Sequence, residues 1–172
     1  TQVLNSILVT LEMALLGTII AIPIGFIFAI FSSRNLTTNS TLYYVSRALI
    51  TFFRTTPSLV WAIFLITTFG LGPRSGTATL IVVSIGFYGR FFAEAIEEVP
   101  KNYIDSLRAL GATKVGIIFS VIIPEALPSF VNTILFNLEH NTRSSAVLGI
   151  VGAGGIGIEL MVSIKTFYYD EA

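Results

Sequence analysis

A run of 21 residues without a charged side chain, residues 13–33, constrains this chain more than any other feature. An α-helix needs about 20 consecutive apolar residues to cross the hydrocarbon core of a bilayer. Inside that core, every backbone polar group must be bonded within the protein, which favours a helix for such a run. The run therefore predicts a spanning helix over residues 3–31, in which Pro23 and Gly25 are tolerated if neighbouring helices satisfy the freed backbone groups.

The composition extends this prediction to the whole chain. Of the 172 residues, 53% are hydrophobic and only 12% are charged, and the mean hydropathy is +0.83. The absence of cysteine excludes disulfides and thiolate metal sites. A net charge of zero and the lack of a basic run argue against a nucleic-acid partner. We therefore expect one domain over residues 1–172, an all-α polytopic bundle in contact with membrane lipid.

Three further spans are expected. They are residues 58–71, which are short for a span, residues 77–96, and a segment whose charge-free centre is 129–138. Pro124 and Pro128 indicate where the last of these helices begins. Residues 43–53 form a basic amphipathic segment and are predicted to lie on the membrane surface.

The basic residues predict the orientation. If four spans alternate, one side of the membrane receives most of them: Arg34, Arg47, Arg54, Lys101, Arg108 and Lys114. The other side receives Arg74 and Arg143. Because cytoplasmic loops carry the excess of lysine and arginine, residues 101–124 are predicted to be cytoplasmic and the region from Glu139 to Gly157 to face outward.

Three charged residues fall at or inside the predicted spans. Glu12 precedes the charge-free run, and we interpret it as a carboxylate near the headgroups rather than an intramembrane functional acid. Arg90 and Glu94 are four residues apart, which predicts a structural ion pair on one helix face near the membrane boundary.

Residues 101–124 are the clearest candidate for contact with a soluble partner. Ile104, Leu107 and Leu110 recur at helical spacing, with charged and polar residues off that stripe. Gly111 then ends the helix, since glycine readily takes a positive φ. This pattern predicts a short, stiff helix presented at the membrane surface, followed by a second apolar helix.

The same segment resembles the EAA loop of ABC-importer permeases, the cytoplasmic loop that inserts into the ATPase. Gly111 and Pro124 carry most of the match, whereas Asp105 replaces the usual glutamate, and Ser106 and Leu107 replace two alanines. The resemblance implies a coupling role for residues within 101–124, namely Ile104, Asp105, Ser106, Leu107, Arg108, Gly111, Ala112 and Pro124.

A dense polar group precedes a glycine-rich run and forms the candidate substrate pathway or gate. Its members are Glu139, His140, Asn141, Arg143, Ser144, Gly152, Gly154 and Gly155. Arginine can bind an oxyanion through two hydrogen bonds, but Arg143 can also pair with Glu139 four residues earlier. The group therefore fits either of two interpretations, a substrate site or a gate that the ion pair closes.

The chemistry of a soluble enzyme is not indicated. His140 is the single histidine, so neither a histidine pair nor a histidine-rich metal site can form within one chain, and no catalytic or metal-binding residues are predicted. The glycines at 152, 154 and 157 imitate a dinucleotide loop, but no βαβ unit surrounds them. We interpret them as closely packed or irregular backbone at membrane depth. No P-loop is present, so the chain does not hydrolyse ATP by that route.

The run 138–149 with its glycine-rich continuation, together with residues 54–62 and 70–73, is similar to permeases of the phosphonate and phosphite ABC importers, which have a MetI-like fold. Methionine permeases share the glycine-rich run. The resemblance implies a subunit of the bacterial inner membrane that works by alternating access, and one further spanning helix after Ala172. It also implies a second permease chain, most simply a homodimer, an extracytoplasmic binding protein, and a separate ATPase that holds ATP and Mg²⁺, with no cofactor in this chain.

Two alternatives belong to other classes of protein. A membrane scaffold subunit would use the same amphipathic helix to bind a partner other than an ATPase, but it leaves the glycine-rich run without a reason. An intramembrane enzyme would use Glu94 or Glu139 as an acid or base, but no nucleophile and base are paired in the sequence.

Overall fold

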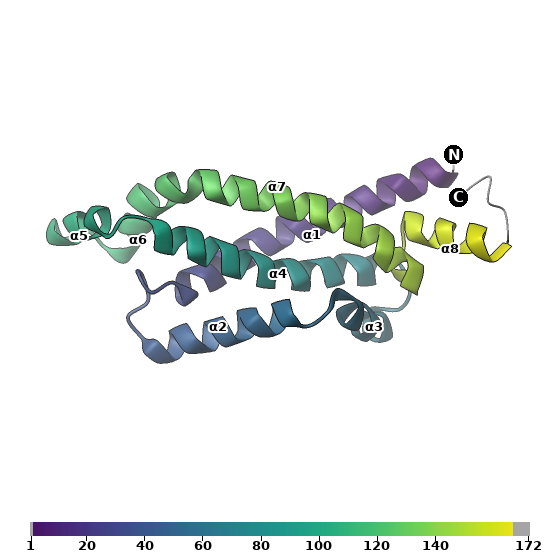
Figure 1. Cartoon of the computed structure of the whole chain (residues 1–172), viewed down its shortest axis with the longest axis horizontal. Helices are drawn as coiled ribbons and strands as arrows, with labels where there is room; N and C mark the ends of the chain where they lie inside the picture. Colours follow the sequence, from purple (N-terminus) through teal and green to yellow (C-terminus); the bar gives the residue numbers. More distant parts are fainter. Residues whose placement is uncertain (1, 167–172) are drawn as a thin grey trace.

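The computed structural model describes residues 2–166, and this part of the chain folds into helices without a strand (Figure 1). The predicted all-α class is confirmed. In chain order the helical elements are α1 (Gln2–Ser32), α2 (Ser40–Thr55), α3 (Ser58–Phe69), α4 (Pro73–Glu98), α5 (Lys101–Ala109), α6 (Lys114–Ile117), the π-helical turn η1 (Ile118–Ile122), α7 (Ile123–Leu148), a second π-helical turn η2 (Gly149–Ala153) and α8 (Ile156–Thr166).

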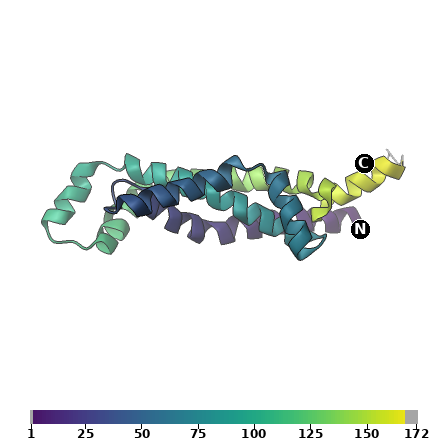
Figure 2. The ribbon, with the colours of Figure 1, turned by 90° about the horizontal axis from the view of Figure 1, so that it is seen from below.

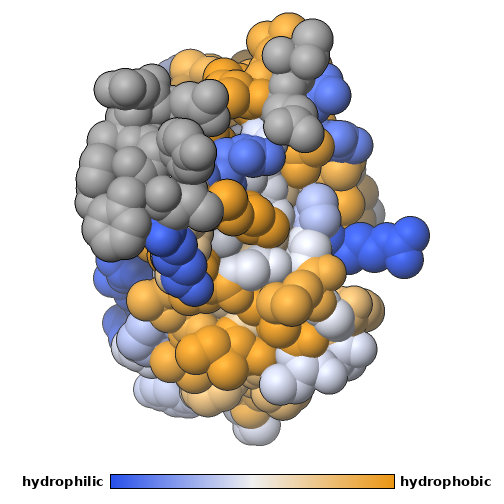
Figure 3. Space-filling view, turned by 90° about the vertical axis from the view of Figure 1, so that its right-hand side faces the viewer, coloured by the Kyte–Doolittle hydropathy of each residue, from blue (hydrophilic) through white to orange (hydrophobic). Residues whose placement is uncertain are grey.

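The molecule is an elongated bundle. Helices α1, α2, α4 and α7 run along its length, and α4 packs against each of the other three (Figures 1 and 2). Helix α5 lies at one end, while α8 and the N-terminus of α1 lie at the other (Figure 1). Seen from the α8 end, hydrophilic side chains stand between apolar patches (Figure 3). The α8 end therefore carries polar groups, as expected where a bundle leaves the hydrocarbon core.

Within residues 2–166, three helical segments are long and apolar enough to cross a membrane: Val3–Ser32, Pro73–Glu98 and Lys114–Ala153. They correspond to three of the predicted spans. Helices α2 and α3 qualify only as a pair, which is bent by 91° at the break between them. Residues 58–71 therefore span the membrane only if the preceding helix contributes, as their length suggested.

Pro124 lies in the first turn of α7, as predicted, whereas Pro128 lies inside that helix, and the continuous helical run that contains α7 starts before both prolines. The helical run begins ten residues earlier, at Lys114, where the Thr113 side chain accepts a hydrogen bond from the backbone N–H of Gly116. Proline cannot donate a backbone hydrogen bond, and inside a helix it normally causes a kink. Here the wider turn η1 ends at Ile122, two residues before Pro124, and the run continues through both prolines.

The prediction that residues 43–53 lie on the membrane surface is also wrong. Helix α2 packs along α1 and α4 and buries Tyr43, Ser46 and Ile50. Glycine allows this close approach, because a Cβ at Gly89 would lie 2.8 Å from Cγ1 of Ile50. The amphipathic pattern of α2 therefore reflects packing against two helices rather than a boundary between lipid and water.

Small residues at every fourth position bring α1 and α4 together. Gly17, Ala21, Gly25 and Ala29 are all buried on α1. A Cβ at Gly17 would lie 2.7 Å from Cβ of Leu80, and one at Gly25 would lie 2.5 Å from Cβ of Tyr88. Small residues with this spacing allow helix backbones to approach closely in membranes, where van der Waals packing drives association.

We predict that Gly25→Ala destabilises the bundle although alanine is the better helix former. Overpacking of this kind costs about 1–3 kcal/mol, which exceeds the gain of at most about 1 kcal/mol in helix propensity. Thermal unfolding in mild detergent measures the effect as a lower midpoint than that of the unaltered protein.

Gly116→Ala is the matched control, because the nearest atom to its added Cβ is 3.4 Å away, the Oγ1 of Thr113. An unchanged midpoint in Gly25→Ala, or an equal loss in Gly116→Ala, contradicts the role of close packing between α1 and α4.

Candidate functional site

Helix α5 is anchored to the bundle by its apolar side. Ile104 is buried, and Leu107 and Ala112 are half-buried against the same core, which also contains Ile96 and Ile117. Gly111 ends the helix with φ of +80°. The backbone N–H groups of Gly111 and Ala112 then donate to the carbonyls of Arg108 and Leu107, each at 3.0 Å. The predicted helix with a glycine stop is therefore confirmed.

The other side of α5 is open. Asp105, Ser106 and Arg108 are exposed, and Leu110 is 82% exposed. A Cβ built at Gly111 would meet no atom within 4 Å. This side of α5 is therefore accessible to a partner.

Asn35, in the loop after α1, ties α5 to the spanning helix α4. Its side-chain amide donates to the carbonyls of Ile96 and Glu97, at 3.1 Å and 3.2 Å, where α4 ends. Its backbone carbonyl accepts a 2.8 Å hydrogen bond from Nη2 of Arg108 on α5. One residue thus satisfies the terminal carbonyls of α4 and holds the exposed helix against it. Sequence reasoning missed Asn35, because an isolated asparagine in a polar loop carries no positional signal.

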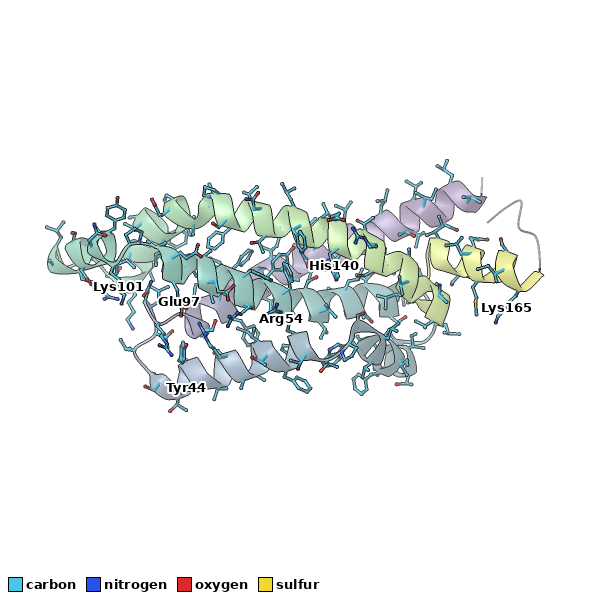
Figure 4. The ribbon with its side chains drawn as sticks, viewed as in Figure 1. Tyr44, Arg54, Glu97, Lys101, His140 and Lys165 are labelled. Carbon is cyan, nitrogen blue, oxygen red and sulfur yellow. The ribbon has the colours of Figure 1, made fainter. Side chains whose placement is uncertain are left out.

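Charged groups secure the same end. Nη2 of Arg47 on α2 lies 2.9 Å from Oε1 of Glu97, and the backbone N–H of Arg34 donates to that oxygen, also at 2.9 Å. A hydrogen bond from Arg34 to the hydroxyl of Tyr43 further raises the pKa of this arginine. Figure 4 shows Glu97 and Lys101 toward the α5 end. The basic residues at 34, 47, 101, 108 and 114 thus gather here, as the orientation argument predicted.

A buried polar cluster joins three helices at the middle of the bundle. The side-chain amide nitrogen of Asn141 donates to Oγ1 of Thr18 at 3.0 Å and to Oγ of Ser84 at 2.9 Å. The amide nitrogen of Asn137 also donates to Ser84, at 3.0 Å. All four residues are at most 3% exposed. Helices α1, α4 and α7 are therefore joined by side-chain hydrogen bonds where water is excluded.

The structure thus separates the polar residues of α7. Asn141 faces inward, Ser144 is half-buried, and Glu139, His140 and Arg143 are exposed. Glu139 and Arg143 form the predicted ion pair. Asn141 contacts Ser84, which lies near the middle of α4. The polar residues around Asn141 therefore lie deeper in the bundle than the outer membrane boundary at which the sequence predicted them.

The glycine run forms a tight break at the outer end of α7. Gly152, Gly154 and Gly155 have positive φ values of 94°, 97° and 70°. The backbone N–H of Gly72 donates to the carbonyl of Gly152 at 2.9 Å, and a Cβ at Gly154 would lie 2.8 Å from Cγ of Pro73. The predicted closely packed, irregular backbone is confirmed.

Two residues singled out in the sequence, Pro124 and Glu12, are exposed in the described part of the chain. Pro124 lies in the first turn of α7. Glu12 lines a groove of about 390 Å³ with Arg74, which lies in the first turn of α4.

The prediction that Arg54 lies at the cytoplasmic boundary of the membrane is wrong. A Cβ at Gly86, in the middle of α4, would lie 3.1 Å from the backbone nitrogen of Arg54. The residue therefore lies at the central depth of a spanning helix, where insertion measurements put the cost of an arginine at about 2.5–3.5 kcal/mol. Arg90 and Glu94 form the predicted ion pair at 2.5 Å.

These features define a polytopic helical membrane protein that presents an anchored, partner-accessible helix at the end where its basic residues gather. Residues 21–172 match the family described as binding-protein-dependent transport system inner membrane component. The chain belongs to this family, and it is a component of the inner membrane.

Several relatives are named as permeases for phosphorus compounds. The chain is 36% identical over 162 residues to the phosphite transport system permease protein PtxC of Stutzerimonas stutzeri, covering 94% of this chain and 59% of that protein. It is 34% identical over 163 residues to the phosphate-import permease protein PhnE of Mycolicibacterium smegmatis, and the match covers 95% of this chain and 31% of that protein. The chain thus spans about a third to three-fifths of the length of these relatives.

Methionine transporters are also similar. The chain is 34% identical over 147 residues to the probable D-methionine transport system permease protein MetI of Vibrio cholerae, and the match covers 82% of this chain and 65% of that protein. A solved inward-facing structure of the MetNI methionine ABC transporter matches with a TM-score of 0.87 at 27% identity, over 94% of this chain and 79% of that one. The MetI-like fold is therefore established.

We predict that Asn35→Asp loosens α5 from the bundle. The substitution replaces a donor with an acceptor facing the carbonyls of Ile96 and Glu97, and each buried group left unsatisfied costs about 1–3 kcal/mol. Hydrogen exchange of the α5 amides should become faster than in the unaltered protein. Asn102→Asp, at an exposed position on α5 itself, is the control and should leave exchange unchanged; equal rates in both variants would contradict the tie.

Proposed function

We propose that this chain forms the membrane core of an ABC-importer permease that carries phosphite or a phosphonate into the cell. The observation that carries the proposal is the anchored but open helix α5 at the basic end of a MetI-like bundle. The names of the relatives supply the substrate class, since several are called phosphite, phosphonate or phosphate permeases.

The partner at α5 is a separate ATPase subunit, which holds ATP and Mg²⁺. The residues directed toward it are Asp105, Ser106, Arg108 and Gly111, while Ile104, Leu107 and Ala112 keep the helix in place. Because Asn35 and Arg108 fix α5 to the end of α4, closure of the ATPase moves a spanning helix as a rigid body.

The transport pathway lies between two permease chains, most simply two copies of this one, and a binding protein delivers the substrate from outside. The pair of Glu139 and Arg143, with His140 beside it, serves as a gate that faces the second chain. Asn141, Ser144 and the glycine break at 152–155 hold that part of α7 in position. The exposure of the pair in a single chain supports this arrangement.

Methionine is the second candidate substrate, because methionine permeases are among the relatives. Uptake into proteoliposomes that contain the complete importer distinguishes the two classes. We expect uptake of labelled phosphite or methylphosphonate that depends on ATP and on the binding protein, and no uptake of methionine. The reverse result would assign the protein to the methionine class.

We predict that Gly111→Arg abolishes coupling without preventing membrane insertion. A large charged side chain fills the open space beside α5 and strains a backbone position with φ of +80°. Purification in mild detergent should recover the ATPase with the unaltered permease and not with this variant.

Gly111→Asn is the matched control, since asparagine tolerates a positive φ better than other side chains do. We expect it to retain the ATPase and most of the uptake. Normal uptake in Gly111→Arg would contradict the coupling role. A preparation of the unaltered permease without any ATPase would favour the scaffold alternative.

A further inference from the structure

Arg54 lies in the spanning region without an acidic partner. Among the acids within residues 2–166, none forms an ion pair with it, whereas Arg47, Arg90, Arg108 and Arg143 are each paired. Its guanidinium lies over the ring of Phe91, whose centroid is 5.3 Å from the guanidinium carbon. Its positive charge is therefore not neutralised within the described part of the chain.

The depth of Arg54 limits what can surround it. The close approach of its backbone to Gly86 places the backbone of Arg54 roughly 18–20 Å from either end of α4, at 1.5 Å per residue, whereas the guanidinium over Phe91 lies about 10 Å from the C-terminal end. The side chain is nevertheless exposed. An exposed, unpaired arginine at this depth does not face hydrocarbon, because ionised residues in spanning regions face a water-filled cavity or the bundle interior.

Arg90 lies near the same part of α2 as Arg54. It lines a small pocket with Arg47 and Thr51, and Thr51 is three residues before Arg54 on α2. Nε of Arg90 is buried and has no hydrogen-bond partner in the described part, although Nη2 is paired with Glu94. Figure 4 shows Arg54 between α2 and α4, with His140 on α7 across α4. The face formed by α2 and α4 contrasts with the part of α1 between residues 15 and 27, whose exposed side is apolar: Leu15, Leu16, Ile19, Ile20, Ile24 and Ile27.

We propose that Arg54 binds the transported oxyanion within the pathway, and that the face formed by α2 and α4 lines this pathway. The planar guanidinium offers two parallel donors that match the geometry of a phosphorus oxyanion. This assignment rests on the proposed function for its ligand class, but the accessibility of the face to water does not depend on the substrate.

The absence of cysteine from this chain permits a direct test. Arg54→Cys is prepared in the complete importer with its ATPase and binding protein, reconstituted in proteoliposomes, with any other accessible cysteine replaced. Water-soluble methanethiosulfonates then label the introduced thiol. The matched control is Ile27→Cys, at a 54% exposed position on the apolar side of α1.

We expect the thiol of Arg54→Cys to react and the thiol of Ile27→Cys not to react. Methylphosphonate, added together with binding protein and ATP, should slow the reaction of the Arg54→Cys thiol. This variant should lower uptake at least tenfold, roughly the effect of losing one charge-assisted contact. The aminoethyl reagent, which restores a cation, should recover part of that uptake, whereas the sulfonatoethyl reagent, which adds an anion, should not. A purely structural role for Arg54 would not distinguish the two reagents.

Several results would overturn the assignment. If the thiol of Arg54→Cys resists water-soluble reagents in the complete importer, the residue does not line a water-filled pathway. Equal recovery with both reagents would exclude anion binding. If Arg54→Cys does not assemble, Arg54→Lys keeps the charge and should retain more uptake than Arg54→Gln; equal uptake in these two variants would also exclude it.

Failure of the proposed function gives a different pattern. In that case the unaltered importer takes up no phosphorus oxyanion, and methylphosphonate does not protect the thiol of Arg54→Cys, even if the face is open to water.

Discussion

The close packing of α1 against α4 is the constraint on which the rest of the structure depends. In lipid there is little hydrophobic drive to hold two apolar helices together, so contact distance decides whether they associate. Gly17 and Gly25 allow contacts with Leu80 and Tyr88 that any side chain at those positions would obstruct. That approach brings Thr18 and Ser84 within reach of the same asparagine on α7, which adds the third helix to the bundle.

The same helix α4 connects the two functional regions. Its C-terminal carbonyls are held by Asn35, which also binds the helix proposed to meet the ATPase. Its middle carries Ser84 in the buried polar cluster and, about two to three turns further along, the pair of Arg90 and Glu94. Because α4 is continuous over 26 residues, a displacement at the coupling end is transmitted along it rather than absorbed. This supports rigid-body motion in preference to local rearrangement.

Charge distinguishes the faces of the bundle. Helix α1 presents an apolar side suited to lipid, whereas α2, α4 and α7 present ionised residues at the depth of the spanning region. Such residues are costly in hydrocarbon, and their positions therefore indicate which faces meet water or protein. In the proposed assembly, the exposed pair of Glu139 and Arg143 is turned away from lipid.

The sequence by itself determined the fold class, the principal spans, the glycine stop of α5 and the ion pairs of residues four apart, because local spacing fixes each of these features. The spacing of Gly17, Ala21, Gly25 and Ala29 was also available as a signal for close helix packing. The depth of Arg54, the course of α2 and the tie through Asn35 were decided only by the tertiary structure. A basic amphipathic segment fits a membrane surface and a helix interface equally well. Only the close approach of α2 to Gly86 and Gly89 selects the interface, and it carries Arg54 into the membrane with it.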